Sequence, residues 1–262
     1  MTSSEKLSTA GLLGRMLTAA LTMLAMTVVL AQSDQTAPDD ALARSIVEKA
    51  DHVRFPAEGF EVSVTIGTTA DGSTEIRKYR VLSKGNENTI VMATEPASER
   101  GQIMLMKGRD LWLFLPQVSQ PVRLSLSHRL TGQVANGDLA RANFLGDYKP
   151  KLLRTEVLDG EATYVLELTA IDRGVTYSRV VYWVRQSNYG PTKAEFYSVS
   201  DRLLKTCLYR NYEKMAGHPR PTRLIMQDAL RKGEESVLDY SEMRLRELPD
   251  KVFTKDYLKR LE

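Results

Sequence analysis

The chain has 262 residues, of which 42% are hydrophobic and 26% are charged. This composition excludes a wholly disordered chain and fits one globular domain of the larger all-β kind. The formal net charge is only +3, which lacks the concentrated positive charge that nucleic-acid binding requires.

The first residues predict a signal peptide. Lys6 and Arg15 precede an uncharged stretch of 18 residues, Met16 to Ser33, in which Val29 and Ala31 are the small residues that a signal peptidase reads. We expect residues 1–31 to be removed by cleavage after Ala31. The alternative is a retained membrane anchor, because the stretch is long enough to span a bilayer.

Cysteine usage predicts a mature protein that is soluble and has no lipid anchor. Position 32 is Gln, so the Cys that a lipoprotein needs at its cleavage point is missing. The only cysteine is Cys207, which excludes an internal disulfide. We expect Cys207 to be a small buried residue on a strand.

Residues 32–40 predict a flexible polar linker, and residues 41–262 the folded domain. Asp39 or Asp40 can cap a helix that ends near Phe55. Its apolar stripe is predicted at helical spacing, on Leu42, Ile46, Val47 and Ala50. We expect this stripe to lie over an open sheet.

The next hundred residues predict strands followed by an irregular segment. Val62, Val64 and Ile66 alternate with polar residues, which is the period-two pattern of a strand. A tight turn at Gly108 predicts a hairpin whose two strands are apolar on both faces. Residues 116–150 are less regular, and two helical turns are expected over residues 138–145, at the mouth of the sheet.

The C-terminal half predicts further antiparallel strands. Residues 152–158 and 162–169 form a hairpin, and residues 178–242 contain five segments rich in β-branched and aromatic residues, separated by turn residues. We interpret the latter as an antiparallel meander. A short helix is predicted after Thr254, with Tyr257, Leu258 and Leu261 on its apolar side.

The order of these segments resembles the outer membrane lipoprotein-sorting family, the LolA-like proteins. The resemblance covers roughly the mature chain and is best from Tyr182 to Tyr240, where a Lys-Ala-Glu-Phe-Tyr strand is followed by His-Pro-Arg-Pro-Thr at 218–222. It implies a mainly β periplasmic protein whose antiparallel sheet curls into an unclosed half barrel around a lipid cavity. It also implies that the N-terminal and C-terminal helices flank the sheet and that a loop or short helix serves as its lid. The chain departs from the family at Ala142-Asn143-Phe144, where relatives carry a Ser-Asp-Phe-like motif.

Two sets of residues are candidates for binding. An apolar set is expected to line the cavity, and plain core packing is the alternative for it: Val62, Val64, Ile66, Met104, Met106, Trp112, Phe114, Leu166, Val180, Tyr182 and Phe196. A basic set is expected to contact lipid head groups or a partner, with residues 217–221 as a rigid presenting loop, and a solvated strand face is the alternative for it: Arg210, Lys214, His218, Arg220 and Arg223.

Residues for catalysis are few, so we expect no enzyme, cofactor or metal. The histidines, His52, His128 and His218, lack the spacing of metal ligands. There is no nucleophile elbow and no phosphate-binding glycine loop. A solvated strand face accounts for the carboxylates that could be paired, which are Glu167, Glu195 and Asp239.

The leading hypothesis is a monomeric periplasmic carrier of lipoprotein or other lipid acyl chains, working toward the outer membrane. The resemblance implies an inner-membrane transporter of RND or ABC type and an outer-membrane acceptor as partners. The alternative is an envelope sensor of the RseB type, which would use the same fold to hold a membrane partner.

Overall fold

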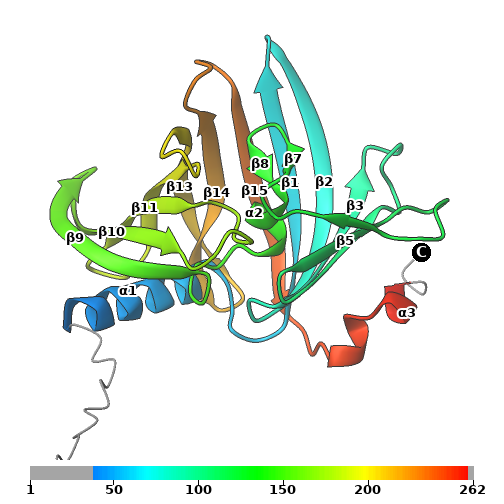
Figure 1. Cartoon of the computed structure of the whole chain (residues 1–262), viewed down its shortest axis with the longest axis horizontal. Coiled ribbons are helices and arrows are strands. Elements are labelled where there is room, and N and C mark those ends of the chain that lie inside the picture. Colours follow the sequence, from blue (N-terminus) through cyan, green and yellow to red (C-terminus); the bar gives the residue numbers. More distant parts are fainter. Residues whose placement is uncertain (1–37, 259–262) are drawn as a thin grey trace, which may run out of the picture. The chain divides into compact units, whose positions relative to one another are not determined.

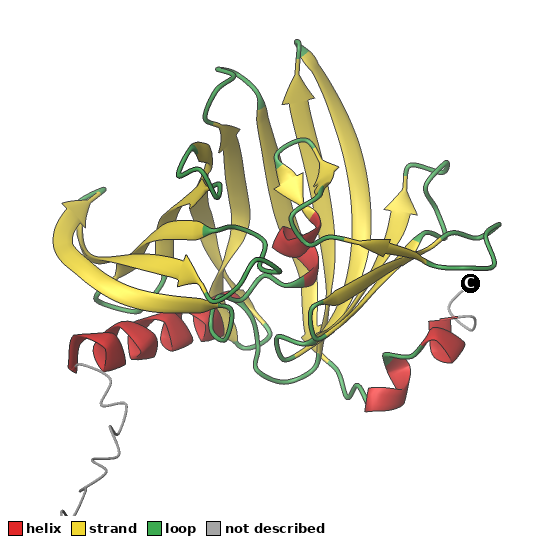
Figure 2. Cartoon of the chain, viewed as in Figure 1, coloured by secondary structure: helices red, strands yellow, loops and turns green. Residues whose placement is uncertain are grey.

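One antiparallel sheet of 13 strands organises the computed structural model, which describes residues 38–258 (Figure 1, Figure 2). The strand order is β6-β5-β4-β3-β2-β1-β15-β14-β13-β12-β11-β10-β9, so two meanders meet where β1 pairs with β15. The edge strands β6 and β9 do not pair with each other, which confirms the predicted mainly β, unclosed sheet. The bounds are β1 (Phe60–Ala70), β2 (Ser73–Lys84), β3 (Asn88–Glu95), β4 (Ile103–Lys107), β5 (Asp110–Phe114), β6 (Val122–Leu124), β9 (Tyr148–Leu158), β10 (Glu161–Ala170), β11 (Arg179–Arg185), β12 (Pro191–Tyr197), β13 (Leu203–Met215), β14 (His218–Asp228) and β15 (Glu235–Leu245).

Tight turns set the register of the long hairpins. Asp71-Gly72, Asp159-Gly160 and Ala216-Gly217 have positive φ at both residues. This backbone conformation matches the right-handed twist of the strands that it joins. The strands β11 to β15 are consecutive antiparallel neighbours, which confirms the predicted meander.

The last of these turns shows that the predicted presenting loop at 217–221 is wrong. Met215 pairs with His218 across the two-residue turn, and β14 continues directly from there. Pro219 and Pro221 fit this strand because β14 pairs with β15 only from Arg223 onward. A proline is tolerated where a strand has a free edge that requires no N–H donor.

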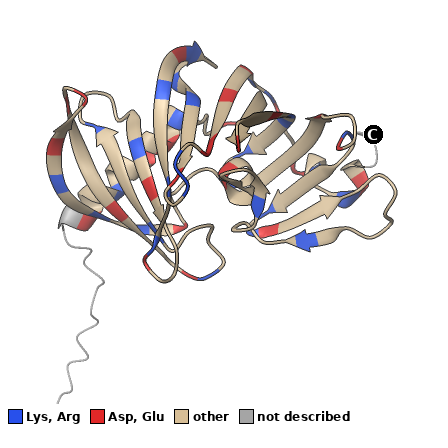
Figure 3. Cartoon of the chain, turned by 90° about the horizontal axis from the view of Figure 1, so that it is seen from above, with Lys and Arg blue, Asp and Glu red and all other residues tan. Residues whose placement is uncertain are grey.

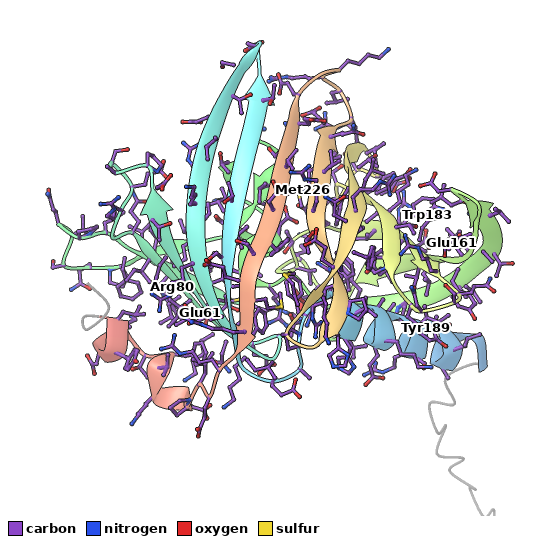
Figure 4. The ribbon with its side chains drawn as sticks, turned by 180° about the vertical axis from the view of Figure 1, so that it is seen from behind. Glu61, Arg80, Glu161, Trp183, Tyr189 and Met226 are labelled. Carbon is purple, nitrogen blue, oxygen red and sulfur yellow. The ribbon has the colours of Figure 1, made fainter. Side chains whose placement is uncertain are left out.

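The helix α1 (Pro38–Arg54) covers one end of the concave face, where it lies against β9 and β14 (Figure 1). It begins within the predicted linker, with a proline at its first position, where no N–H donor is needed. Its buried stripe contains Ile46, Val47 and Ala50 as predicted, but Ala43 takes the place of Leu42, which is 45% exposed. Helix and sheet are also joined at the surface of the molecule. The Nζ of Lys49 on α1 donates to the Tyr189 hydroxyl in the β11–β12 turn at 3.2 Å (Figure 4).

Residues 125–147, here called the plug, connect β6 to β9 across the concave face. They contain the strands β7 (Arg129–Thr131) and β8 (Val134–Ala135) and the helix α2 (Asn136–Ala140), which lie in front of the central strands in Figure 1. The plug approaches the sheet closely at Gly132, where an added Cβ would be 2.3 Å from the Ser236 hydroxyl oxygen. The predicted short helix is therefore present, although it ends at Ala140 and starts two residues before the expected range.

The convex face has its own apolar cluster beneath the C-terminal segment. A turn of 3₁₀ helix (Asp250–Val252) and the helix α3 (Lys255–Leu258) follow β15, and α3 starts after Thr254 as predicted. Val252, Phe253 and Leu258 pack there against Ile90 and Leu105 of the sheet. The strands β3 and β4 are therefore buried on both faces, which explains their nearly continuous apolar sequences.

The predicted signal peptide and most of the predicted linker lie outside the described residues. Within residues 38–258, no helix combines the length and the apolar character needed to cross a membrane.

Candidate functional site: the plugged concave face

The concave face of the sheet is a continuous apolar wall, and nine of the eleven predicted lining residues are part of it. All nine belong to one buried cluster with the stripe of α1, and none is more than 4% exposed. They are Val62, Val64, Ile66, Met104, Met106, Leu166, Val180, Tyr182 and Phe196. They come from five strands across the sheet, so the alternating patterns predicted separately from each strand meet on one surface.

The structure does not bring Trp112 and Phe114 to this wall. The β4–β5 hairpin pairs Leu105 with Trp112, so these two side chains share the convex face. Phe114 packs against the convex cluster, and Lys255 of α3 lies 5.5 Å from the Trp112 ring centroid. The neighbouring residue Leu111 faces the interior instead and is fully buried.

The plug fills most of the space in front of the wall. A cavity of about 30 Å³ remains between Val62 and Leu139, and one of about 20 Å³ remains beside Arg54 and Phe144. Each holds about one water molecule, whereas small-molecule sites span roughly 300 to 1,000 Å³. A ligand of the size of an acyl chain can therefore enter the interior only if the plug moves.

An open cleft leads toward this interior between the plug and strands β2 to β5. Its volume is about 320 Å³. Val91 and Met104 form its apolar floor, and His128 and Asn136 of the plug form its polar rim. Met104, one of the predicted lining residues, therefore lies next to an opening to the surface.

Two charged residues at the end of α1 are buried where helix, plug and sheet meet. The Asp51 carboxylate accepts hydrogen bonds from the amides of Phe144 and Leu145 in the plug, at 2.9 and 2.8 Å. Its other oxygen is 3.7 Å from Nη1 of Arg54, which is longer than a hydrogen bond. Both residues are at most 6% exposed. Asp51 therefore fastens the end of the plug to α1 and only partly balances Arg54.

Asp51 makes stability depend on pH. Burial raises its pKa to about 6, against the opposing influence of Arg54, so the folded state holds this proton more tightly than the unfolded state does. The contribution is fully present below pH 4 and is lost as the pH rises through 6. Two pKa units correspond to about 3 kcal/mol. We expect Asp51→Asn to remove this part of the pH dependence in urea unfolding at pH 4.5 and 7.5, whereas parallel profiles of the two proteins would contradict the assignment.

A second buried ion pair holds α2 against the sheet. Lys205 on β13 donates to the Asp138 carboxylate at 2.5 Å and to the Gln133 carbonyl at 2.6 Å. The Tyr177 hydroxyl donates to the same carboxylate at 2.8 Å, and the amide of Ala135 does so at 2.7 Å. Lys205 and Asp138 are about 5% exposed, so the pair is shielded from solvent and from salt.

A third buried group joins the plug to the turns of the N-terminal half of the sheet. Arg141 pairs with Asp147 within the plug and donates to the carbonyls of Asn86 and Gly108, at 2.5 and 2.7 Å. Arg109, in the β4–β5 turn, contacts the same Asp147 carboxylate at 2.9 Å. Asp147 thus connects two arginines from different parts of the chain.

Cys207 is buried in the interior, as predicted. Burial raises the pKa of its thiol to about 12, so only about one thiol in ten thousand is ionised at pH 8. We expect almost no reaction of the folded protein with a disulfide reagent at pH 8, and one equivalent in urea. Rapid stoichiometric labelling without denaturant would show that the interior is open to solvent.

The predicted basic residues do not form one surface. Arg220 is 3% exposed and donates to the carbonyls of His52, Val53 and Met215, so it cannot contact a head group. Arg210 and Arg223 are cross-strand neighbours, and each pairs with its own carboxylate. Lys214 and His218 are exposed. Basic and acidic residues are interspersed over the strands (Figure 3).

The carboxylates considered for catalysis do not converge. Glu167 contacts Arg179 at 3.5 Å, Glu195 contacts Lys193 at 2.6 Å, and Asp239 contacts Arg223 at 2.6 Å. The most buried carboxylate outside the plug and α1 is Glu61 on β1, which lies beside Arg80 at 2.6 Å (Figure 4). Arg244 and Arg246 also contact it, so its role is to hold β15 to β1 and β2.

Sequence reasoning missed the buried charged residues where the plug meets the helix and the sheet: Asp51, Arg54, Asp138, Arg141, Asp147 and Lys205. One signal was available, because Asp51 and Arg54 continue the helical spacing of Val47 and Ala50. A charged residue in an apolar stripe indicates a buried polar contact.

Comparison with known proteins supports this architecture. A family model described as "Uncharacterized protein" matches residues 85–260, whereas no curated protein matches the chain. The crystal structure of a LolA superfamily protein from Nitrosomonas europaea is 68% identical, with 82% of this chain and 98% of that chain covered and a TM-score of 0.79. A DUF1329 family protein from Desulfovibrio piger is 25% identical, with 85% and 100% covered and a TM-score of 0.74. A putative outer membrane lipoprotein-sorting protein domain from Vibrio parahaemolyticus is 22% identical, with 84% and 100% covered and a TM-score of 0.74, and shows the same fold.

Proposed function

The chain belongs to the LolA superfamily, and we propose on this basis that it is a carrier of acyl chains. It takes up the chains of a lipoprotein or another lipid on its concave face and hands them on, toward the outer membrane, without catalysis. The observation that carries this proposal is a continuous apolar wall covered by a separate segment, the plug, which is held there by apolar packing and by three buried polar groups.

The energetics of such a carrier are favourable. Burying a chain of about 16 carbons contributes roughly 13 kcal/mol before ordering costs, at about 0.8 kcal/mol per CH₂. Displacing the plug offsets part of this gain, because its apolar residues lose the same kind of contact. The balance makes binding reversible, which a carrier requires if it is to release its cargo.

The proposed binding surface needs no reactive group. The nine predicted lining residues have aliphatic, aromatic or methionine side chains, and methionine adapts to apolar ligands of varied shape. Binding and release therefore depend on the movement of the plug and α1. We propose a function without a chemical step and without a cofactor.

The proposed cellular location is the periplasm. Residues 1–31 are the proposed signal peptide, and the remaining chain would work as a soluble monomer. Sequencing the N-terminus of the exported protein tests this step, with Gln32 as the expected first residue. Retention of Met1 would favour the membrane anchor.

The proposed partners are an inner-membrane transporter of RND or ABC type and an outer-membrane acceptor. Of the predicted basic contacts, Arg210, Lys214, His218 and Arg223 remain candidates for docking, whereas Arg220 does not because of its burial. His218 borders a surface groove of about 470 Å³ at the end of α1.

Lipid transfer between two vesicle populations tests the carrier function. We expect substoichiometric protein to accelerate the movement of a fluorescent fatty acid from donor to acceptor vesicles, and heat-unfolded protein to have no effect. A rate equal to spontaneous transfer, together with no uptake of the probe, would rule out the carrier. The sensor alternative would then be tested by binding to an envelope protein.

A further inference from the structure

Arg54 is a buried cation with unused hydrogen-bonding capacity. Its side chain is 6% exposed, and its Nη1 has no hydrogen-bond partner within residues 38–258. A guanidinium carries five N–H donors and stays charged, so it remains a strong site for an anion. Asp51 balances this charge only in part: its Oδ1 lies 3.7 Å from Nη1 and likewise has no hydrogen-bond partner in the described part of the chain, and its other oxygen accepts from the plug amides.

A second unpaired donor lies close by. The Tyr182 hydroxyl is buried on the concave wall and likewise has no partner in the described part of the chain. Burial raises the pKa of this hydroxyl well above its ordinary value, so it keeps its proton and can donate. Buried polar groups are usually satisfied, and two unpaired donors in one place are therefore unusual.

The ring of Phe144 packs against both Arg54 and Tyr182. Its centroid is 5.0 Å from the Arg54 guanidinium carbon and 5.0 Å from the Tyr182 ring centroid. Phe144 belongs to the plug, which must move before a ligand can enter the interior. Its withdrawal would uncover Arg54 and Tyr182 beside Tyr148, Phe196 and Tyr209, aromatic residues that line the small cavity next to Arg54 together with the charged Asp138 and Arg141.

The geometry points to a subsite at Arg54 and Tyr182 for the anionic group of an acyl ligand, a carboxylate or a phosphate, with Phe144 as its place-holder in the closed state. This inference rests on the proposed carrier function and narrows its ligand class to amphiphiles with a negative charge next to the chain. A carboxylate or phosphate supplies several acceptor oxygens and a charge for Arg54, whereas an alcohol or an ester offers no charge.

Competition binding at pH 8 tests the subsite. Hexadecanoate, hexadecyl phosphate and hexadecanol are each titrated as competitors against a neutral fluorescent dye bound to the purified protein. The measured quantity is the ratio of the affinity for each anion to the affinity for the alcohol. We expect anion-to-alcohol ratios of about 10 to 100 for the wild type, as for hydrogen bonds to charged groups. The stronger of the two anions identifies the source as a fatty acid or a phosphorylated lipid.

Variants separate the subsite from the cavity. Arg54→Gln should bring the ratio close to one with hexadecanol affinity retained, and Tyr182→Phe should lower it about two- to tenfold. Arg220→Gln is the matched control, since its donors already bind carbonyls outside the interior, and it should keep the wild-type ratio. Equal binding of anion and alcohol to the wild type, or wild-type ratios in both test variants, would overturn the subsite alone. Failure of all three probes to bind would overturn the carrier proposal as well.

Discussion

Replacing Asp147 by Asn is expected to lower the free energy of unfolding by about 3 to 5 kcal/mol. Asp147 is 3% exposed and is the shared carboxylate of Arg109 and Arg141. Removing its charge leaves Arg141, which is 6% exposed, as a buried cation without a counterion. Breaking one side of a buried ion pair has a cost of this size because the remaining charge stays desolvated. Urea unfolding followed by circular dichroism measures the change.

Asp172 provides a matched control for this prediction. It also contacts Arg109, but half of its side chain is exposed. Asp172→Asn should therefore leave the urea midpoint close to that of the wild type, since exposed ion pairs contribute little. Similar losses in the two variants would show that Asp147 is no more than a surface partner of Arg109, and that the plug is not anchored through it.

Phe144→Ala is expected to lower stability and to strengthen ligand binding at the same time. The ring is 6% exposed and packs against Tyr148 and Tyr182, so its removal should lower the free energy of unfolding by about 3 to 5 kcal/mol. The substitution removes contacts that exist only in the closed state, because the ring has already left them in the ligand-bound state. It therefore destabilises the closed state relative to the ligand-bound state. The population that can bind increases, and we expect the affinity for a fluorescent acyl probe to rise at least about tenfold.

Phe253→Ala distinguishes this effect from general loosening of the fold. Phe253 is 1% exposed in the convex cluster, on the other face of the sheet from the plug. Its truncation should cause a similar loss of stability without any gain in affinity. Equal gains in both variants would mean that destabilisation alone opens the interior, and no gain in Phe144→Ala would mean that the plug does not compete with the ligand.

The sheet could be predicted from the sequence because its signals are local. Alternation along β1 and the turn residues between the later strands depend on neighbours in the chain, and the antiparallel meander that they predicted is confirmed. The unclosed sheet, which is also confirmed, was implied by the family resemblance and not by these local signals. The position of the plug depends on contacts between distant segments, such as Lys205 with Asp138. No local pattern records such pairs, so they could not be predicted.

The wrong assignment of Trp112 and Phe114 to the cavity wall could have been avoided from the sequence. A two-residue turn at Gly108-Arg109 pairs Lys107 with Asp110 and therefore Met106 with Leu111. This register assigns Leu111 to the face of Met106 and Trp112 to the opposite face. Arg220 is different, because its burial results from carbonyls at the end of α1, which are more than 160 residues away in the chain.

The central claim is that the concave face holds acyl chains once the plug is displaced. Native mass spectrometry of the protein isolated from its exported form, followed by solvent extraction and lipid identification, tests it most directly. We predict a population with the added mass of an acyl lipid, which solvent extraction removes. Protein that carries no lipid, and that also fails to take up a fluorescent fatty acid in the Phe144→Ala variant, would contradict the claim.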